Sequence, residues 1–495
     1  MLIPITLAPD QPVLAAVVHA LHHRRPTDLA QLPTLTNIAL GDPYLAEQLA
    51  ALHRDFELQP PPATTPLARL RTRLAWWLLG REMQQITTTH AELVRVLDSL
   101  VVQLDQERIA RRRIEAHLAE PEPPTGTTSS APATLPPNTP SALVWHSTFA
   151  APTGYSGSAR AFVLGLDARG LAVRPLYLYG TDYDEQLLMG QLHPRIRALQ
   201  ATPVPLDAPQ VVYAPGDRFS KNSGSYRIGF TMLEVDRLPP TWVQQANQMH
   251  AVWTPTAWGA EVFQASGVTR PIHIVPLGVD LDTFTPALGP RTQLGDLTIF
   301  LSVFEWNIRK GWDVLLDAYT AAFRRDDPVL LLLKVDCREP AANPLREMLA
   351  RLPSPTAPIG LIYNQTLTTT QLRELYHLSD CFVLPTRGEG WGMPILEAMA
   401  CGIPAIATDW SAPTTFLTPH NGYPLPITGL VAADSSSRYY RDARWAEPDR
   451  AALIELLRHV ANHPHECRQK GQHAHHTAQQ WTWERAVDTV LAGLG

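Results

Sequence analysis

Short apolar runs alternate with helical patterns along most of the chain from residue 142 onward. In the clearest case, apolar residues 381–385 and 405–409 flank a glycine-rich segment and a short helical pattern. Pro394 is suited to open that helix, because proline fits the first helical turn. The order strand, loop, helix, strand is the repeating unit of a parallel sheet, so the pattern predicts an α/β fold.

Two groups of apolar runs predict two α/β domains, the first over residues 141–288 and the second over residues 289–478. In the first group, the predicted strands cover residues 142–146, 173–179, 210–214, 227–236, 251–256 and 273–279. In the second group, they cover residues 297–304, 329–335, 358–363, 381–385 and 405–409. Ligands of such sheets bind at the carboxyl ends of the strands, so the loops that follow the strands are the candidate site.

Residues 1–120 carry mainly helical patterns, which cover residues 13–22, 44–56 and 66–118. In the longest of them, apolar residues at three- and four-residue steps form a short heptad-like seam. Two interpretations stay open: a helical hairpin or bundle that packs on the main body, and a coiled coil that joins two copies of the chain. A proline-rich stretch, residues 121–140, predicts an extended linker.

The same N-terminal region contains a segment with leucines and tryptophans on one face and arginines nearby, residues 67–81. A basic amphipathic helix of this kind can lie on a membrane surface. An ordinary half-buried helix with a solvated arginine face explains the pattern equally simply, and we favour it. Peripheral membrane contact is therefore an open option.

Composition and charge narrow the range of partners. With 495 residues, of which 45% are hydrophobic and 18% charged, the chain is typical of globular proteins with two or three domains. Its net charge of −6 gives no general attraction to nucleic acid, which we exclude as a partner. We see no signal peptide, no apolar run that could span a bilayer, and neither a zinc spacing nor a disulfide framework among the cysteines. These features predict a cytoplasmic protein, peripheral at most at the inner membrane face.

Charged residues follow two strands of the second domain. Arg309 and Lys310 follow the first predicted strand, whereas Glu389 and Glu397 follow the fourth, and both loops emerge at the same edge of a parallel sheet. The cations suit a diphosphate, and the glycine-rich loop offers backbone N–H groups to an anion. The carboxylates can accept hydrogen bonds from sugar or ribose hydroxyls. Together these groups predict a ligand that contains both phosphates and sugars.

The first domain offers weaker signals. The stretch from Gly154 to Gly157, which includes Tyr155, has the composition of a glycine-rich loop between the first strand and a helix over residues 161–169. Such a loop lets a ligand approach the backbone, although many turns of this kind need glycine for geometry alone. Glu234 lies near the end of a predicted strand, where it faces either the site or solvent.

The segment from Gly388 to Gly402 resembles the E-x7-E signature of retaining GT-B glycosyltransferases, the GT4-type or group 1 enzymes. Residues 253–256, 275–280 and 304–316 are similar to further segments of that family. The resemblance covers about residues 142–494. It implies two Rossmann-like domains that face each other across a cleft, in addition to the N-terminal helical or coiled-coil extension. It also implies that the last helix, about residues 479–495, completes the first domain.

The resemblance implies a hexosyltransferase (EC 2.4) that needs no metal or other cofactor. The donor would be a nucleotide-diphosphate-sugar, the acceptor a glycan, a lipid-linked or another hydroxyl compound, and the anomeric configuration would be retained. Glu389 and Lys310 would contact the donor sugar and the diphosphate, and Glu397 would hold the ribose. The backbone of four further residues would line the donor, namely Gly390, Trp391, Gly392 and Met393. The stretch with Gly154, Tyr155 and Gly157 would lie on the acceptor side, near the phosphates.

The sequence departs from the family at two places. The arginine that the family places five residues before the lysine falls on Glu305, so Arg309 is expected to supply that charge. The histidine that many relatives place in the cleft of the first domain is not evident, and Glu234 lies in an equivalent region. A nucleotide-sugar epimerase, a phosphorylase and a catalytically silent scaffold stay open as alternatives. A histidine-rich stretch, residues 463–476, invites a metal interpretation, but its polar helical context favours solvated histidines.

Overall fold

The computed structural model describes ten ranges of the chain, all in one compact unit: residues 2–8, 11–22, 139–150, 153–178, 193–205, 207–287, 297–337, 344–353, 356–435 and 437–494. The helices predicted at residues 44–56 and 66–118 lie outside the described residues. The heptad seam, the basic amphipathic segment and nearly all of the proline-rich stretch lie outside them as well.

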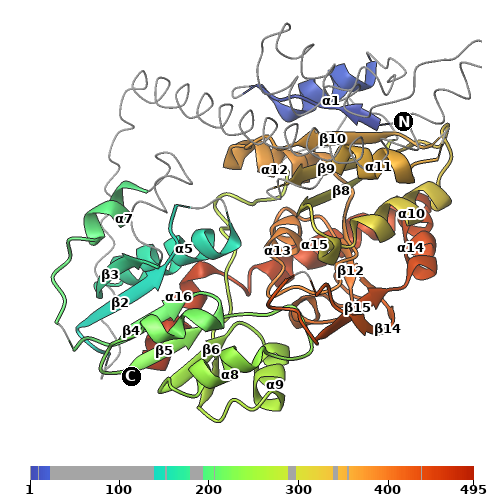
Figure 1. Cartoon of the computed structure of the whole chain (residues 1–495). Helices are drawn as coiled ribbons and strands as arrows, with labels where there is room; N and C mark the ends of the chain where they lie inside the picture. Colours follow the sequence, from blue (N-terminus) through green and yellow to red (C-terminus); the bar gives the residue numbers. More distant parts are fainter. Residues whose placement is uncertain are drawn as a thin grey trace, which may run out of the picture. The chain divides into compact units, whose positions relative to one another are not determined.

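Two parallel sheets organise the described residues (Figure 1). The first has the strand order β3-β2-β4-β5-β6-β7, and the second has the order β1-β10-β9-β8-β11-β12-β13. The strands of the first sheet are β2 (Ala142–Ser147), β3 (Ala172–Tyr177), β4 (Gln210–Tyr213), β5 (Arg227–Phe230), β6 (Ala251–Thr254) and β7 (Ile272–Ile274). Those of the second are β1 (Leu2–Pro4), β8 (Thr298–Glu305), β9 (Val329–Asp336), β10 (Ile359–Tyr363), β11 (Cys381–Leu384), β12 (Ala405–Thr408) and β13 (Tyr423–Leu425). The predicted α/β architecture with two parallel sheets is confirmed.

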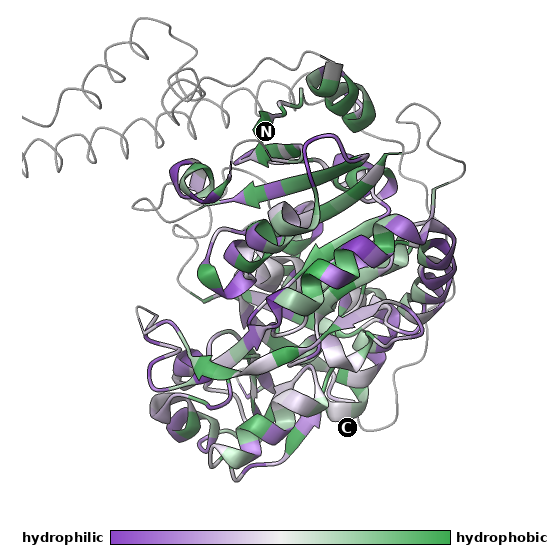
Figure 2. Ribbon diagram, turned by 90° about the vertical axis from the view of Figure 1, so that its right-hand side faces the viewer, coloured by the Kyte–Doolittle hydropathy of each residue, from purple (hydrophilic) through white to green (hydrophobic). Residues whose placement is uncertain are grey.

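Helices cover the faces of these sheets, which explains why the strands read as continuous apolar runs. Strand β9 is buried along all but its last residue, and Figure 2 shows the strands as mainly hydrophobic ribbons among helices of mixed hydropathy. The helices that follow strands of the first sheet are α5 (Gly154–Ala168), α7 (Pro194–Leu199), α8 (Pro240–Ala246) and α9 (Ala257–Ala265). Those around the second sheet are α1 (Val13–His22), α10 (Trp312–Ala322), α11 (Pro344–Arg351), α12 (Thr369–Leu378), α13 (Met393–Ala400), α14 (Arg450–Asn462) and α15 (Pro464–Ala478).

The last helix, α16 (Trp483–Leu494), packs on α5 of the first domain (Figure 1). The Trp483 and Phe162 rings meet edge to face at a centroid distance of 5.4 Å, and Asp488 forms an ion pair with Arg169. The chain therefore returns to the first domain after completing the second, as the family resemblance implied.

The assignment of residues 2–22 to a separate helical region is wrong. Strand β1 adds to the edge of the second sheet, parallel to β10, with Ile3 opposite Gly360. Helix α1 forms over the predicted range 13–22, but it packs against α12. A strand of three residues shows no periodicity of its own, so its conformation depends on the partner strand that supplies its hydrogen bonds.

Two predicted boundaries in the first domain are also wrong. The stretch from Gly154 to Gly157 is the first turn of α5 rather than a loop, because the side chain of Thr153 caps the helix by accepting a hydrogen bond from the Ser156 N–H at 3.2 Å. Strand β5 ends at Phe230 rather than at residue 236. After it, the chain leaves the sheet, and the Asp236 N–H donates to the carbonyl of Arg444 in the second domain at 2.9 Å.

A hairpin that the sequence did not predict lies between β13 and α14. Its strands, β14 (Ile427–Ala432) and β15 (Arg444–Pro448), pair antiparallel and form a sheet of their own. Residues of this hairpin and its loop, including Tyr440 and Trp445, pack in one apolar cluster with Leu233, Val235 and other residues of the first domain.

Candidate functional site

The candidate site lies where the order of strand addition in the second sheet reverses. From β8 the chain continues to β9 and β10 on one side, and β11, β12 and β13 follow on the other side. Strands β8 and β11 are direct neighbours. The loops after their carboxyl ends therefore meet at the switch point, which is the position where open parallel sheets bind ligands. The first loop carries Arg309 and Lys310, and the second carries Glu389.

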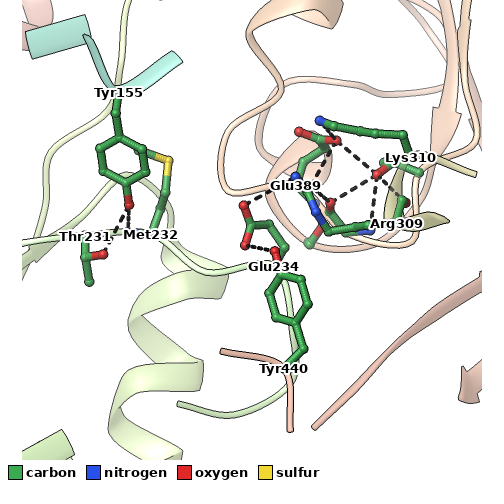
Figure 3. A network of polar contacts seen from close by, with 11 residues as sticks. Tyr155, Thr231, Met232, Glu234, Arg309, Lys310, Glu389 and Tyr440 are labelled. Carbon is green, nitrogen blue, oxygen red and sulfur yellow. Dashed lines mark hydrogen bonds and ion pairs between the residues drawn. The ribbon is translucent and has the colours of Figure 1, made fainter. Parts of the chain in front are cut away.

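Figure 3 shows these three charged side chains in contact. The Lys310 ammonium donates to Glu389 Oε1 at 2.6 Å. Arg309 Nη1 donates to the carbonyl of Gly388 at 2.5 Å and lies 3.4 Å from Glu389 Oε1. The side chains of Lys310, Arg309 and Glu389 are 12%, 14% and 6% exposed, so the ion pairs are shielded from water. The structure brings together the three residues predicted to act on the donor.

Burial and charge have opposing effects on the protonation of this cluster. Burial alone would raise the pKa of Glu389, but Lys310 and Arg309 hold the pKa of this carboxyl below its usual value. Burial also lowers the pKa of Lys310, although Glu389 offsets part of that effect. The Arg309 pKa is raised despite burial, because Glu234 and Glu389 are close. Glu389 is therefore ionised at neutral pH and bonded to cations rather than poised as an acid.

The loop around Glu389 is fixed on several sides. The Thr386 hydroxyl lies 3.0 Å from both the Gly388 carbonyl and Glu389 Oε1. The Glu389 N–H donates to the Ser411 hydroxyl at 3.0 Å. Ser411 has a φ of 62°, which is uncommon for a residue other than glycine and marks local backbone strain. Such constraints hold the carboxylate in one orientation before any ligand binds.

Glu234 of the first domain reaches the same cluster (Figure 3). Its Oε1 lies 3.7 Å from Arg309 Nη2, and its Oε2 accepts a hydrogen bond from the Tyr440 hydroxyl at 3.0 Å. A side chain on Gly388 would collide with the Glu234 carbonyl, and one on Gly390 would lie 2.6 Å from Met232 Cγ. These glycines therefore permit the loop that carries Glu234 to approach, which is a second reason for the glycine-rich composition.

Tyr155 contacts that loop rather than the cations. Its hydroxyl lies 3.2 Å from Thr231 Oγ1 and accepts a hydrogen bond from the Met232 N–H at 3.4 Å. Burial raises the pKa of this phenol above its ordinary value. Gly154 has open space where a side chain would stand, and Gly157 is nearly as open. Neither glycine is thus required by close packing, and their acceptor-side role stays a prediction.

Glu397 lies on α13 and accepts a hydrogen bond from the hydroxyl of Tyr376 on α12 at 2.7 Å. Burial raises the pKa of Glu397 to about 7, although the bond from Tyr376 acts in the opposite direction. The ribose-binding role predicted for this residue thus belongs to a carboxyl that titrates near neutral pH.

Three of the remaining donor-loop residues, Gly390, Trp391 and Gly392, can offer only their backbone. Trp391 is 2% exposed, and its ring meets the rings of Phe416 and Trp481 at centroid distances of 5.5 Å. Gly392 has a φ of 95°, which favours glycine, and Met393 begins α13. Their contact with a donor stays a prediction, and the burial of Trp391 limits it to main-chain groups.

Sequence reasoning missed several residues at this site. Tyr440 lies in a polar stretch without a motif, and only the fold brings it to Glu234. Thr386 and Arg387 precede the glycine-rich loop directly, and their position beside it was the available signal. In the histidine-rich stretch, ring nitrogens of His473 and His475 bond to backbone carbonyls, so these two are not simply solvated.

No helix in the part of the chain that the structure covers is long and apolar enough to cross a membrane. No group of three or more histidine, cysteine, aspartate or glutamate side chains in the described ranges is arranged to hold a metal ion.

Similar proteins agree with the geometry. Residues 296–441 match the family described as "Glycosyl transferases group 1". The chain is 30% identical over 239 residues to D-inositol 3-phosphate glycosyltransferase of Jonesia denitrificans, which covers 45% of this chain and 50% of that protein. It is 28% identical over 261 residues to a GDP-mannose-dependent alpha-(1-6)-phosphatidylinositol monomannoside mannosyltransferase of Mycobacterium tuberculosis, which covers 49% of this chain and 63% of the relative. The chain thus spans about half to two thirds of the length of these curated relatives.

Solved structures show the same fold. HepE of Anabaena in complex with UDP-glucose has a TM-score of 0.52 at 12% identity, covering 71% of this chain and 98% of that one. A structure described as trehalose-6-phosphate from E. coli bound with UDP-2-fluoro glucose has a TM-score of 0.51 at 11% identity, covering 72% of this chain and 99% of that one. Residues 296–441 therefore belong to the glycosyl transferases group 1 family, and the two α/β domains have the GT-B fold.

Proposed function

We propose that the protein transfers a sugar from a nucleotide-diphosphate-sugar to a hydroxyl acceptor. The observation that carries this proposal is the buried cluster of Arg309, Lys310 and Glu389 at the switch point of the second sheet. Two shielded cations suit a diphosphate, and the adjacent carboxylate suits a sugar hydroxyl. The match of this segment to the glycosyl transferases group 1 family supports the same activity.

The chemistry follows from where charge develops. When the bond between the sugar and the diphosphate breaks, negative charge accumulates on the leaving phosphate oxygen. Lys310 and Arg309 stabilise this charge, and their effect is strong because the surroundings exclude water. No catalytic metal or other cofactor is invoked, since the two side chains supply positive charge where it is needed.

We infer that the reaction retains the anomeric configuration. Glu389 is held by Lys310 and Thr386. It lies in the segment from Gly388 to Gly402, which resembles the signature of retaining GT-B glycosyltransferases, and this resemblance assigns Glu389 to sugar binding rather than to nucleophilic attack. Glu397, at the ribose, lies on a different element. The two carboxylates therefore do not act as the acid and nucleophile of a glycosidase.

For the donor and the acceptor, we propose the chemical class rather than the compound. The names of the two relatives mention a GDP-mannose donor, inositol phosphate and a phosphatidylinositol mannoside, and the similar structures hold UDP-sugars. We therefore propose a nucleotide hexose as the donor and a glycan or lipid-linked hydroxyl compound as the acceptor. A cytoplasmic location is part of the same proposal, whereas peripheral membrane contact and a homodimer through the N-terminal region stay options that the sequence leaves open.

Nucleotide release from a panel of UDP-, GDP- and ADP-hexoses tests the activity, with and without sugar and inositol acceptors. We expect one donor to be consumed, and we expect Lys310→Met to lower kcat about a hundredfold to a thousandfold, because one stabiliser of the leaving group is lost. Lys221→Met removes the same charge from an exposed position of the first domain and should leave kcat unchanged.

The products separate the competing functions. An isomerised nucleotide-sugar without an acceptor would indicate an epimerase, and a sugar 1-phosphate formed from inorganic phosphate would indicate a phosphorylase. If no nucleotide or nucleotide-sugar bound at all, the chain would be a silent scaffold and the proposal would be wrong. Coupling constants of the anomeric proton in the product decide between retention and inversion.

A further inference from the structure

Arg387, which directly precedes the glycine-rich loop, is one of the most fully bonded side chains of the structure. Arginine carries five N–H groups in a planar fork. Nε and Nη2 donate to the two carboxylate oxygens of Glu447 at 2.9 and 3.0 Å. Nη1 and Nη2 donate to the two oxygens of Asp313 at 2.8 and 3.0 Å. Nη1 also donates to the carbonyl of Ile308 at 2.7 Å, so all five N–H groups have a protein partner.

These partners lie on three different elements. Ile308 belongs to the short turn that presents the two catalytic cations, Asp313 lies in the first turn of α10, and Glu447 lies on β15 of the hairpin. The backbone of Arg387 joins the same elements, because its N–H donates to the Arg309 carbonyl at 2.6 Å and its carbonyl accepts from the Ala446 N–H at 3.0 Å. Arg387 thus connects the Ile308–Lys310 turn, the loop that carries Glu389 and the hairpin.

Arg387 cannot itself bind a diphosphate in this arrangement. Its side chain is 8% exposed, and each of its N–H groups already donates to a protein oxygen. A role in the reaction must therefore be indirect. The side-chain bond to Ile308 and the backbone bond to Arg309 both hold the turn that contains Lys310, so Arg387 can act on the reaction through the position of this turn.

We propose that Arg387 is a positioning residue that fixes Arg309 and Lys310 relative to Glu389, and that Glu447 makes the β14–β15 hairpin part of this support. This inference rests on the proposed sugar transfer, because it assigns the residues a task in that reaction. A shift of the Ile308–Lys310 turn would move the charges of Arg309 and Lys310 away from the leaving phosphate. A displacement of about 1 Å costs roughly a hundredfold in rate.

The fork of Arg387 is what the position requires, rather than its charge alone. Lysine keeps the positive charge but has three donors on a flexible stem, so it cannot bind both carboxylates in two-pronged fashion and reach Ile308 as well. Glu447→Gln keeps the shape of the partner and one oxygen, but it replaces an acceptor by a donor that faces the Arg387 fork. Both variants thus loosen the support without removing a large side chain.

Steady-state kinetics of the full chain with the donor that it turns over tests the inference. We expect kcat to fall about a hundredfold in Arg387→Lys and about tenfold in Glu447→Gln, with a smaller change in the KM for the donor. In the double variant, the loss should be close to that of Arg387→Lys alone, because both residues act through one contact. A role in folding alone would move the melting temperature and leave the kcat of the folded enzyme unchanged.

Matched controls come from the neighbouring helix α14. Arg450→Lys and Glu455→Gln make the same chemical changes at side chains that are 62% and 74% exposed, and they should retain kcat. Unchanged kcat in folded Arg387→Lys and Glu447→Gln, or losses that simply multiply in the double variant, would overturn the positioning role while the proposed function stands. A wild-type chain that turns over no nucleotide-sugar would overturn both.

Discussion

Glu397 is the residue whose ionisation matters most near neutral pH, because burial raises its pKa to about 7. If it holds the ribose hydroxyls, as proposed, the carboxylate binds them better than the neutral acid, which offers fewer acceptor sites. We expect the dissociation constant of the cognate nucleoside diphosphate to rise as the pH falls below about 7, approaching tenfold per pH unit. Isothermal titration calorimetry between pH 5.5 and pH 8.5 measures this dissociation constant. Glu397→Gln should bind weakly with no such slope, and an equally steep slope in that variant would contradict the assignment.

Tyr376 provides an independent check at the same residue. Its hydrogen bond lowers the pKa of Glu397, so Tyr376→Phe should shift the midpoint of the binding profile to higher pH.

The raised pKa of Glu397 also affects folding, and the effect has a defined sign. A carboxyl with a raised pKa in the folded state binds more protons there than in the unfolded chain, so its contribution to stability decreases as the pH rises from about 4.5 through 7. Thermal melting of Glu397→Gln should lack that decrease.

The N-terminal strand, β1, is the least expected element of the second domain. Gln365 accepts a hydrogen bond from the Leu7 N–H at 2.8 Å and donates to the Ile5 carbonyl at 2.7 Å. Gln371 of α12 similarly donates to the Ala8 carbonyl at 2.9 Å, so the segment after β1 is held by side chains as well as by β10. These bonds satisfy backbone groups of the segment that follows β1.

We therefore expect Gln365→Ala to loosen residues 2–8. Two partly buried hydrogen bonds are lost, which together contribute about 1–3 kcal/mol to stability. Hydrogen exchange of residues 2–8 should become faster, whereas exchange in β11 and β12 should not change. Gln469→Ala, at an exposed position of α15, serves as the control. Unchanged exchange at residues 2–8 would show that the pairing with β10 holds the strand without help.

The elements differ in how well the sequence predicts them, and the reason is physical. Strands such as β9 are buried on both faces, so their apolar runs are visible in the sequence, and α1 was predicted at its observed bounds. Strand β1 has only three residues, and β14 has an irregular register and is partly exposed, so neither shows a regular pattern and both depend on contacts with other elements. The capping of α5 by Thr153 extends that helix into a stretch whose composition is typical of a loop.

The site follows the same division. Arg309, Lys310 and Glu389 were predictable, because charged residues after neighbouring parallel strands must meet at one edge. Tyr440 was not, since a contact between a hairpin loop and another domain leaves no periodic signal. The position of Arg387 beside the glycine-rich loop was a signal, but its pairing with Glu447 depends on a hairpin that the sequence did not predict. Glu234 was predictable as a candidate only, and its contact with Arg309 depends on how the chain leaves β5.

The ion pair between Glu234 and Arg309 joins the two α/β domains at the candidate site. The cluster contains two cations, Arg309 and Lys310, and two carboxylates, Glu234 and Glu389, so its charges balance while no donor is bound. A diphosphate adds negative charge and must compete with a carboxylate for the cations. Glu389 is held by Lys310 and Thr386, whereas Glu234 lies 3.7 Å from Arg309, so we expect a diphosphate to compete with Glu234 rather than with Glu389.

We therefore expect Glu234→Gln to bind the cognate nucleoside diphosphate about threefold to tenfold more tightly at low ionic strength, because the neutral amide no longer competes for Arg309. The gain should shrink in 0.5 M salt, where charges are screened over about 4 Å. Asp207→Asn changes the net charge equally at an exposed position of the first domain and should not alter binding. Tyr440→Phe removes only the hydrogen bond that orients Glu234 and should have a smaller effect in the same direction. Isothermal titration decides the matter: weaker binding in Glu234→Gln would mean that this carboxylate supports the diphosphate site, and the two domains would then cooperate in binding the donor rather than compete for Arg309.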